Sequence, residues 1–157
     1  LFPGLDEVMK AQDSVYGAMP DIKNRVDIFG SQLIMNEEDE VIGSLERLLL
    51  TAADLGVDDV FEIAKSLGGV AIPAHVDRDS YSIISNLGFI PDNLDIKYVE
   101  FSRNCDITGY LARNPFLGEF KHIISSDAHE LGSILERESF IDLEEMSIEC
   151  LIHTLGR

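Results

Sequence analysis

The sequence predicts an α/β fold with a mainly parallel sheet, or part of a barrel. Three short apolar stretches, at residues 70–74, 97–102 and 121–126, have the length and composition of buried strands. Helical patterns stand before and between them, so strands and helices alternate as they do in βαβ units. With 157 residues, the chain is long enough for one domain with a substantial core.

The first part of the chain is predicted to form helices and a hairpin. Apolar residues at helical spacing predict a helix over residues 4–18, which Pro20 closes. Two short apolar runs around a polar turn at residues 36–39 predict a β-hairpin. Two further helices are expected at 46–55 and 56–69; the second has acidic residues in its first turn and ends on a glycine pair.

The remaining elements continue the alternation of strands and helices. A short helix is expected at residues 80–88, and a helix followed by a loop at 107–120. A further strand is expected at 138–143 and a last helix at 147–156. Because no internal repeat and no linker interrupts this order, residues 1–157 are interpreted as a single domain.

The charge of the chain excludes some partners. The formal net charge is -17, from 29 acidic and 12 basic residues. Such a surface repels the phosphate backbone, so extended nucleic acid is not an expected partner, although solubility alone also explains the charge. A small phosphorylated ligand held by metal ions stays compatible with it, because the ions reverse the local charge.

The sequence predicts a cytoplasmic protein without a membrane segment. No apolar run approaches the roughly 20 residues that a membrane helix needs, and no secretory signal pattern stands at the front. Cys105 and Cys150 are too far apart to form a zinc motif, and two cysteines are too few for a disulfide framework. Free thiols in a reducing compartment are the expected state.

Polar side chains follow the three predicted strands at the point where each strand ends. His75 follows the first, Arg103 and Asn104 follow the second, and Asp127 and His129 follow the third. Ligands of parallel α/β folds bind outside the carboxyl ends of the strands, because the loops there converge on one rim. If the chain stays extended after the third strand, its carboxylate and imidazole point to the same side. These residues are therefore predicted to meet at one site.

The chemistry of these groups is that of a metal or phosphate site. Carboxylate oxygen and imidazole nitrogen are ligands of zinc, manganese and iron, which makes His75, Asp127 and His129 candidate ligands. The simpler interpretations are a helix N-cap for the aspartate, a hydrogen-bonded rim residue for His129, and a satisfied strand residue for His75. Arg78 and Arg103 are surface arginines by default, although a guanidinium at a site rim suits bidentate phosphate recognition.

Two motifs together resemble the PHP family, the polymerase and histidinol phosphatase domain. "GGVAIPAHVDR" at residues 68–78 places Pro-Ala-His at one strand end, and "SSDAH" at residues 125–129 places Ser-Asp-Ala-His at a later one. The resemblance covers nearly the whole chain, including "LGFIPDNL" and "VEFSRN" between the motifs. It is greatest to uncharacterised bacterial PHP proteins rather than to the polymerase-attached modules.

The resemblance implies both a fold and an activity. The fold would be a distorted (β/α)7 TIM-like barrel whose carboxyl rim holds two or three metal ions, manganese, zinc or iron. The activity would be that of a phosphoesterase, which cleaves phosphate monoesters or diesters of a small substrate with a metal-bound hydroxide. His75 would be a metal ligand, Asp127 and His129 would be metal ligands in the catalytic centre, and Arg78 and Arg103 would contact the phosphate.

The sequence departs from the family pattern at its beginning. The family starts with a His-x-His on its first strand and continues with further histidine, aspartate and glutamate ligands, whereas the first histidine here is His75. We therefore expect the chain to be the C-terminal portion of a PHP domain, with the N-terminal strands missing. Three ligands are too few for a multi-metal cluster, so this chain alone is expected to be nearly inactive. Open barrel edges are expected to make it self-associate.

Two other functions stay open at this stage. The chain could be a degenerate PHP domain that serves as a non-catalytic binding or scaffold module. It could also be a metal hydrolase of the amidohydrolase type, which acts on C–N rather than P–O bonds. The arginines near the predicted rim favour phosphate as the substrate group.

Overall fold

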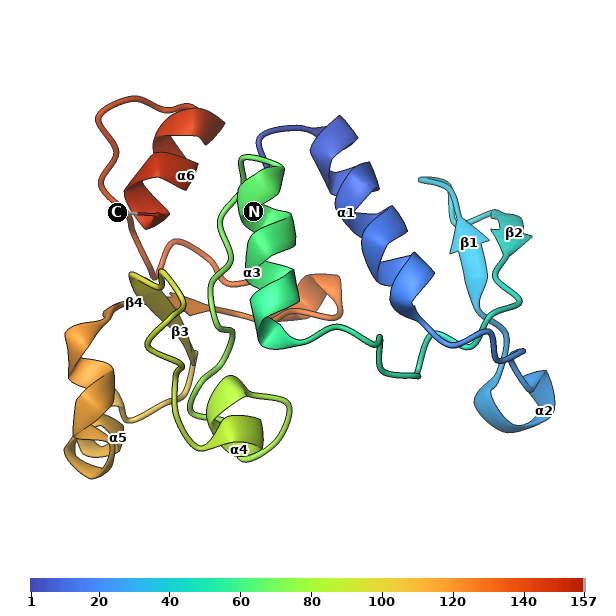
Figure 1. Cartoon of the computed structure of the whole chain (residues 1–157). Helices are drawn as coiled ribbons and strands as arrows, with labels where there is room; N and C mark the ends of the chain where they lie inside the picture. Colours follow the sequence, from blue (N-terminus) through green and yellow to red (C-terminus); the bar gives the residue numbers. More distant parts are fainter. Residues whose placement is uncertain (157) are drawn as a thin grey trace.

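The computed structural model describes residues 1–156, which form a small α/β structure with two separate two-stranded sheets. Helices α1 and α3 lie side by side in the middle; the β1–β2 hairpin is at one end, and α4, α5 and α6 gather around β3 and β4 at the other (Figure 1). The elements are α1 (Leu5–Ala18), α2 (Val26–Phe29), β1 (Leu33–Met35), β2 (Val41–Ser44), α3 (Val57–Ser66), α4 (Ile83–Leu87), β3 (Tyr98–Ser102), α5 (Ile107–Arg113), the 3-10 turn η1 (Pro115–Glu119), β4 (Lys121–Ser125), the 3-10 turn η2 (Leu131–Ser133) and α6 (Ile148–Leu155).

Several helices begin and end at capping residues. Ser82 precedes α4, and its Oγ accepts a hydrogen bond of 3.0 Å from the backbone N–H of Ser85. Gly88 closes the same helix in the left-handed conformation, with φ 80°, which glycine adopts without steric cost. Ser147 caps the start of α6 as Ser82 caps the start of α4, because its Oγ accepts a hydrogen bond of 3.2 Å from the N–H of Cys150. Local capping therefore sets where α4 begins and ends and where α6 begins.

The parallel pairing of β3 and β4 places one face of this sheet in the core. The register runs from Tyr98 opposite Lys121 to Ser102 opposite Ser125. Residues of β3 alternate between buried and half-buried, as a sheet with one covered face requires. The core on the covered face contains Val76, Ile90, Ile96, Val99, Phe101 and Leu117, with α4 and α5 residues packed against it.

The predicted strand at 70–74 is not formed; residues 73–76 instead run beside β3 without forming a regular strand. Glu100 of β3 donates its N–H to the carbonyl of Pro73 at 2.9 Å, and Val76 donates its N–H to the carbonyl of Glu100 at 2.8 Å. A regular parallel pair uses two residues that are two positions apart on the neighbouring strand, whereas these are three apart. His75 lies in the resulting bulge and has a positive φ of 33°. Bulges of this kind redirect side chains and are frequent next to functional sites.

The prediction of a (β/α)7 barrel, whole or partial, is wrong. Within residues 1–156, β3 and β4 form one two-stranded sheet and β1 and β2 form another, antiparallel one, so no barrel closes. A barrel requires each strand to pair on both sides around a complete ring. Among residues 1–156, the segment predicted as a strand at 138–143 forms no strand, and Phe140 within it is largely exposed.

The predicted helix at 46–55 is also wrong. Asn24 donates its N–H to the carbonyl of Glu46, Leu48 donates its N–H to the carbonyl of Ile22, and Lys23 and Arg47 form an isolated antiparallel bridge. The backbone groups of the segment are thus satisfied by a distant part of the chain rather than within a helix. A run of leucines can support either arrangement, and the tertiary contacts decide between them.

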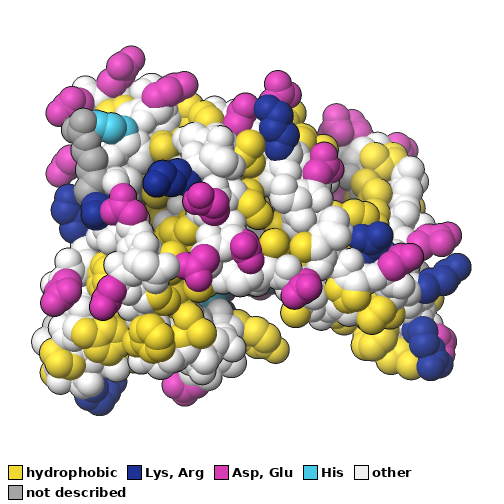
Figure 2. All heavy atoms as spheres, viewed as in Figure 1, with side chains coloured by type: hydrophobic (Ala, Val, Ile, Leu, Met, Phe, Trp, Pro, Cys, Tyr) yellow, Lys and Arg dark blue, Asp and Glu magenta, His cyan; other side chains and the backbone are white. Residues whose placement is uncertain are grey.

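Apolar side chains of the β1–β2 hairpin face solvent. Leu33, Val41 and Ile42 of the hairpin are exposed, the last at 65%, and yellow patches are visible over this end of the molecule (Figure 2). Exposed apolar patches and open strand edges favour association with other chains. None of the helices within residues 1–156 combines the length and the apolar character needed to cross a membrane.

We expect the chain to self-associate through this apolar surface. Light scattering should give a mass above 17.4 kDa that rises with protein concentration and with salt, because salt screens the repulsion between chains of net charge -17. Ile42→Lys should shift the equilibrium toward the monomer. Ser31→Lys adds the same charge without removing apolar surface and is the matched control. A constant monomeric mass at all concentrations and salt levels would contradict this expectation.

Candidate functional site

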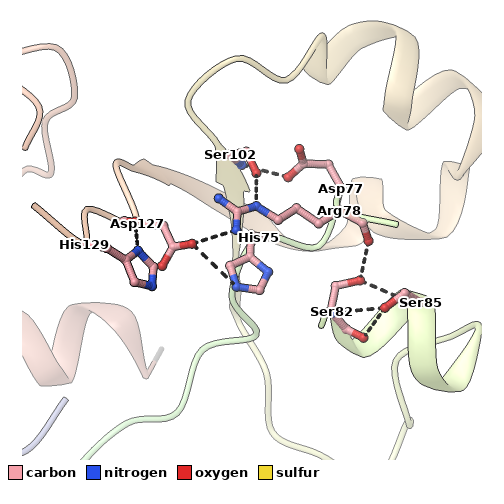
Figure 3. A network of polar contacts seen from close by, with 8 residues as sticks. All are labelled: His75, Asp77, Arg78, Ser82, Ser85, Ser102, Asp127 and His129. Carbon is pink, nitrogen blue, oxygen red and sulfur yellow. Dashed lines mark hydrogen bonds and ion pairs between the residues drawn. The ribbon is translucent and has the colours of Figure 1, made fainter. Parts of the chain in front are cut away.

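His75, Arg78 and Asp127 meet where the 73–76 segment and β4 end (Figure 3). The Oδ2 atom of Asp127 lies 2.8 Å from Nη1 of Arg78 and 4.0 Å from Nε2 of His75. The parallel direction of β3 and β4, and the 73–76 segment beside β3, bring these loops to one edge of the sheet. The structure therefore brings together three of the five side chains that the sequence assigned to the site.

The backbone at this edge is unusual at two positions. His75 and Asp127 both have positive φ, 33° and 48° respectively, which non-glycine residues rarely adopt. Such conformations cost about 1–3 kcal/mol each and persist where the surrounding structure determines them, often at functional sites. Both residues turn their side chains toward each other from these positions (Figure 3).

The end of β3 holds Arg78 in place. Nε of Arg78 donates a long hydrogen bond of 3.4 Å to Oγ of Ser102, the last residue of β3. The backbone N–H of Ser102 in turn donates to Oδ1 of Asp77 at 2.7 Å, and Oγ of Ser82 donates to the carbonyl of Arg78 at 2.8 Å. Figure 3 shows the guanidinium between Ser102 and Asp127. The sequence reasoning missed Asp77 and Ser102, although Ser102 ends the strand predicted at 97–102 and Asp77 lies three residues after the one predicted at 70–74.

His129 does not share the orientation of Asp127. Nδ1 of its exposed ring is 2.8 Å from the backbone carbonyl of Asp127. The prediction that both side chains point to one side assumed an extended chain, and the positive φ of Asp127 breaks that extension. The proposed N-cap role of Asp127 is also absent, because the next helical turn, η2, begins at Leu131 and its N-cap is Glu130.

Arg103 lies in a different ion pair. Its Nη2 atom is 2.9 Å from Oε1 of Glu138, and both side chains are about half exposed. The structure thus joins the end of β3 to the 138–143 segment through Arg103, while Arg78 is the arginine that contacts Asp127. Arg103 is therefore not brought into the cluster.

Two partly buried groups near Asp77, Cys105 and Tyr110, have raised pKa values. Burial, followed by the nearby Asp77 carboxylate, raises the pKa of the Cys105 thiol to about 11. A thiol with so high a pKa stays protonated at neutral pH and is a poor metal ligand or nucleophile. Burial also raises the pKa of Tyr110, whose hydroxyl donates to the carbonyl of Val76 at 2.9 Å. Both groups serve the packing beneath the site.

The metal cluster implied by the resemblance does not fit the residues as they are placed. Among residues 1–156, no group of three or more His, Cys, Asp or Glu side chains is arranged to hold a metal ion. Zinc sites take three or four protein ligands, whereas here one imidazole faces one carboxylate that Arg78 already neutralises. Nδ1 of His75 is also buried without a hydrogen-bond partner, although a metal-bound histidine normally donates its second ring nitrogen to a partner.

A cleft of about 1120 Å³ lies elsewhere, between α1, α3 and residues 70–72. Most of the side chains that line it are apolar. Glu100 and Ile123, which lie opposite each other on β3 and β4, are also part of the lining. None of the predicted site residues lines this cleft. An apolar cleft of this kind does not suit a phosphate group, so we assign the candidate site to the strand ends.

The fold and the site together define a small α/β protein with a carboxylate, an imidazole and a guanidinium clustered at strand ends. Comparison of the chain with models of protein families, with curated proteins and with solved structures finds no match. Membership of the PHP family therefore stays a prediction from the two sequence motifs.

Proposed function

We propose that this chain supplies active-site residues of a metal-dependent phosphoesterase of the PHP type, which hydrolyses phosphate mono- or diesters of small molecules in the cytoplasm. The observation that supports the proposal is that His75 and Arg78 both face one carboxylate oxygen, Oδ2 of Asp127, at the strand ends. These are the side chains to which the two PHP motifs point. Free thiols at Cys105 and Cys150 agree with a reducing compartment.

Arg78 provides the positive charge that a phosphate needs in so acidic a chain. Its side chain is 44% exposed, so its planar set of N–H donors reaches solvent and matches two oxygens of a phosphate group. Arg103 stays a proposed second phosphate contact, although its present partner is Glu138. His75, Asp127 and His129 stay the proposed metal ligands of this chain, and a complete site needs ligands in addition to them.

A non-catalytic binding module is the second candidate. It is favoured by the ion pair between Arg78 and Asp127, which leaves the carboxylate neutralised, and by the lack of a third metal ligand in the cluster within residues 1–156. Such a module would bind a phosphorylated molecule through Arg78 without cleaving it. The difference between the two candidates is whether the phosphate ester is hydrolysed.

The test is a phosphate-release assay with the natural gene product that contains these residues. Its substrates are p-nitrophenyl phosphate, bis(p-nitrophenyl) phosphate, sugar phosphates and, for the amidohydrolase alternative, amides. We expect turnover of phosphate esters that depends on Mn²⁺, Zn²⁺ or Fe²⁺, stops with a chelator and returns when metal is added. Calorimetric binding of phosphate esters without turnover would favour the binding module. The absence of both turnover and binding would overturn both candidates. Cleavage of C–N bonds alone would favour an amidohydrolase.

A further inference from the structure

We propose that the cleft between α1, α3 and residues 70–72 binds an amphipathic organic cation, with its apolar body between the helices and its ammonium group at the carboxylate of Glu100. A protonated primary amine on a hydrocarbon chain is a ligand of this class. The cleft shares no lining residue with the cluster of His75, Arg78 and Asp127, so this ligand site is independent of the proposed function.

The size and the lining of the cleft suit a small apolar ligand. Its volume of about 1120 Å³ is close to the upper end of the range for ligand sites, roughly 300–1,000 Å³, and such sites are mostly apolar with a few polar groups. Val8 and Val15 of α1 line the cleft and are each 42% exposed, and Val60 of α3 is 45% exposed. A hydrocarbon chain that covers these side chains removes its own apolar surface and theirs from water, which favours binding.

The β3–β4 sheet contributes Glu100 from the face opposite the core. Val99 and Phe101 are fully buried in the core, so the side chain of Glu100 between them points to the other face. Ile123, which lies opposite Glu100 on β4, lines the cleft beside it. The cleft therefore contains a carboxylate among apolar side chains.

The charges in the cleft favour a cation. Glu100 and Asp13 are the acidic residues of the lining, and within residues 1–156 no Lys, Arg or His lines it. Glu100 is half-buried, and no ion pair among these residues neutralises it. The amino group of Leu1 borders the cleft but donates to the carbonyl of Val70 at 2.8 Å. A carboxylate among apolar groups loses hydration, and an ammonium group of the ligand supplies a partner for it.

The charge of the whole chain acts in the same direction. With a net charge of -17, the protein attracts a cation and repels an anion that has the same hydrocarbon chain. For one chain length, an amine should therefore bind more tightly than a neutral alcohol, and the alcohol more tightly than a fatty-acid anion.

The test is a calorimetric titration of this chain with decylamine, decanol and decanoate, each below the concentration at which it aggregates. Decylamine should bind about tenfold more tightly than decanol, as expected for one charge-assisted hydrogen bond, and decanoate should bind most weakly. Glu100→Gln should lose this tenfold preference and keep its affinity for decanol. Glu62→Gln removes a carboxylate of α3 that does not line the cleft, so it should bind like the unchanged chain. Circular dichroism confirms that each variant is folded.

Heteronuclear NMR locates the bound amine. The backbone amide signals of Val15, Val60 and Ile72 in the cleft should shift when decylamine is added, whereas the signal of Ile42 in the hairpin should not. Signals that shift only in the hairpin would overturn the inference, because the amine would then bind the exposed apolar patch there.

The calorimetric outcomes that would overturn the inference are equally clear. They are equal affinity for the three ligands, an unchanged preference in Glu100→Gln, an equal loss in the Glu62→Gln control, and no binding of decylamine. An affinity that falls as the protein concentration rises would also overturn it, because a second copy of the chain would then fill the cleft.

Discussion

The Asp127→Asn variant of the natural gene product is expected to lose more than about a hundredfold of the metal-dependent phosphate release that we propose for it. The substitution keeps the shape of the side chain but removes the negative charge that faces both His75 and Arg78. A neutral amide is a much weaker metal ligand than a carboxylate, and it does not neutralise the guanidinium. The measurement is kcat/KM for phosphate release at saturating metal.

The stability of this variant should change little. The Arg78–Asp127 pair is partly exposed, and such pairs contribute about 0–1 kcal/mol to folding. Asp95→Asn is the matched control, because it removes a carboxylate from an exposed ion pair with Lys97 and should leave activity unchanged. Retained turnover of Asp127→Asn with stoichiometric metal would refute the assignment of Asp127.

The Phe101→Ala variant is expected to lose about 4 kcal/mol of the free energy of unfolding. Phe101 belongs to β3, is 0% exposed and lies in the core against which α5 residues pack. Its ring makes edge-to-face contacts with Tyr110 at 5.9 Å and with His122 at 5.7 Å between centroids. Because small domains are stable by about 5–15 kcal/mol, this loss would remove a large share of the total.

Urea unfolding followed by circular dichroism measures this effect. Phe140→Ala is the matched control, since Phe140 is 83% exposed and its truncation should change the free energy of unfolding by less than about 0.5 kcal/mol. Similar losses in both variants would show that Phe101 is not a core residue. A folded Phe101→Ala chain with unchanged midpoint would lead to the same conclusion.

Most helices, the hairpin and the β3–β4 strands were predictable, because local interactions determine them, whereas the short helix α2 was not predicted. The expected helix at 4–18 is α1, that at 56–69 contains α3, and that at 147–156 contains α6. The strand predicted at 70–74 is replaced by an irregular segment beside β3, and the segments at 46–55 and 138–143 were predicted wrongly as a helix and a strand. Both are short apolar runs whose structure depends on distant partners, which no local pattern reveals.

Part of the site was predictable for a similar reason. Polar residues at the carboxyl ends of parallel strands converge in any such fold. A prediction based on this rule placed His75 and Asp127 in one site, and the structure confirms that they face each other. The rule did not foresee that His129 would bond to the carbonyl of Asp127, or that Arg103 would pair with Glu138. Those contacts depend on backbone angles and on a segment that is distant in sequence.

The sequence by itself determined the positions of most helices, the parallel strand pair and the edge where its polar residues gather. Those features follow from periodicity, capping and chain direction, which act over a few residues. Only the tertiary structure decided that the strands form two small sheets rather than a barrel, and that Arg78 pairs with Asp127 while Arg103 pairs with Glu138. Strand pairing and ion pairing both require two partners that are distant in the sequence to come together. The free energy of each pair therefore depends on both partners and on the fold that places them.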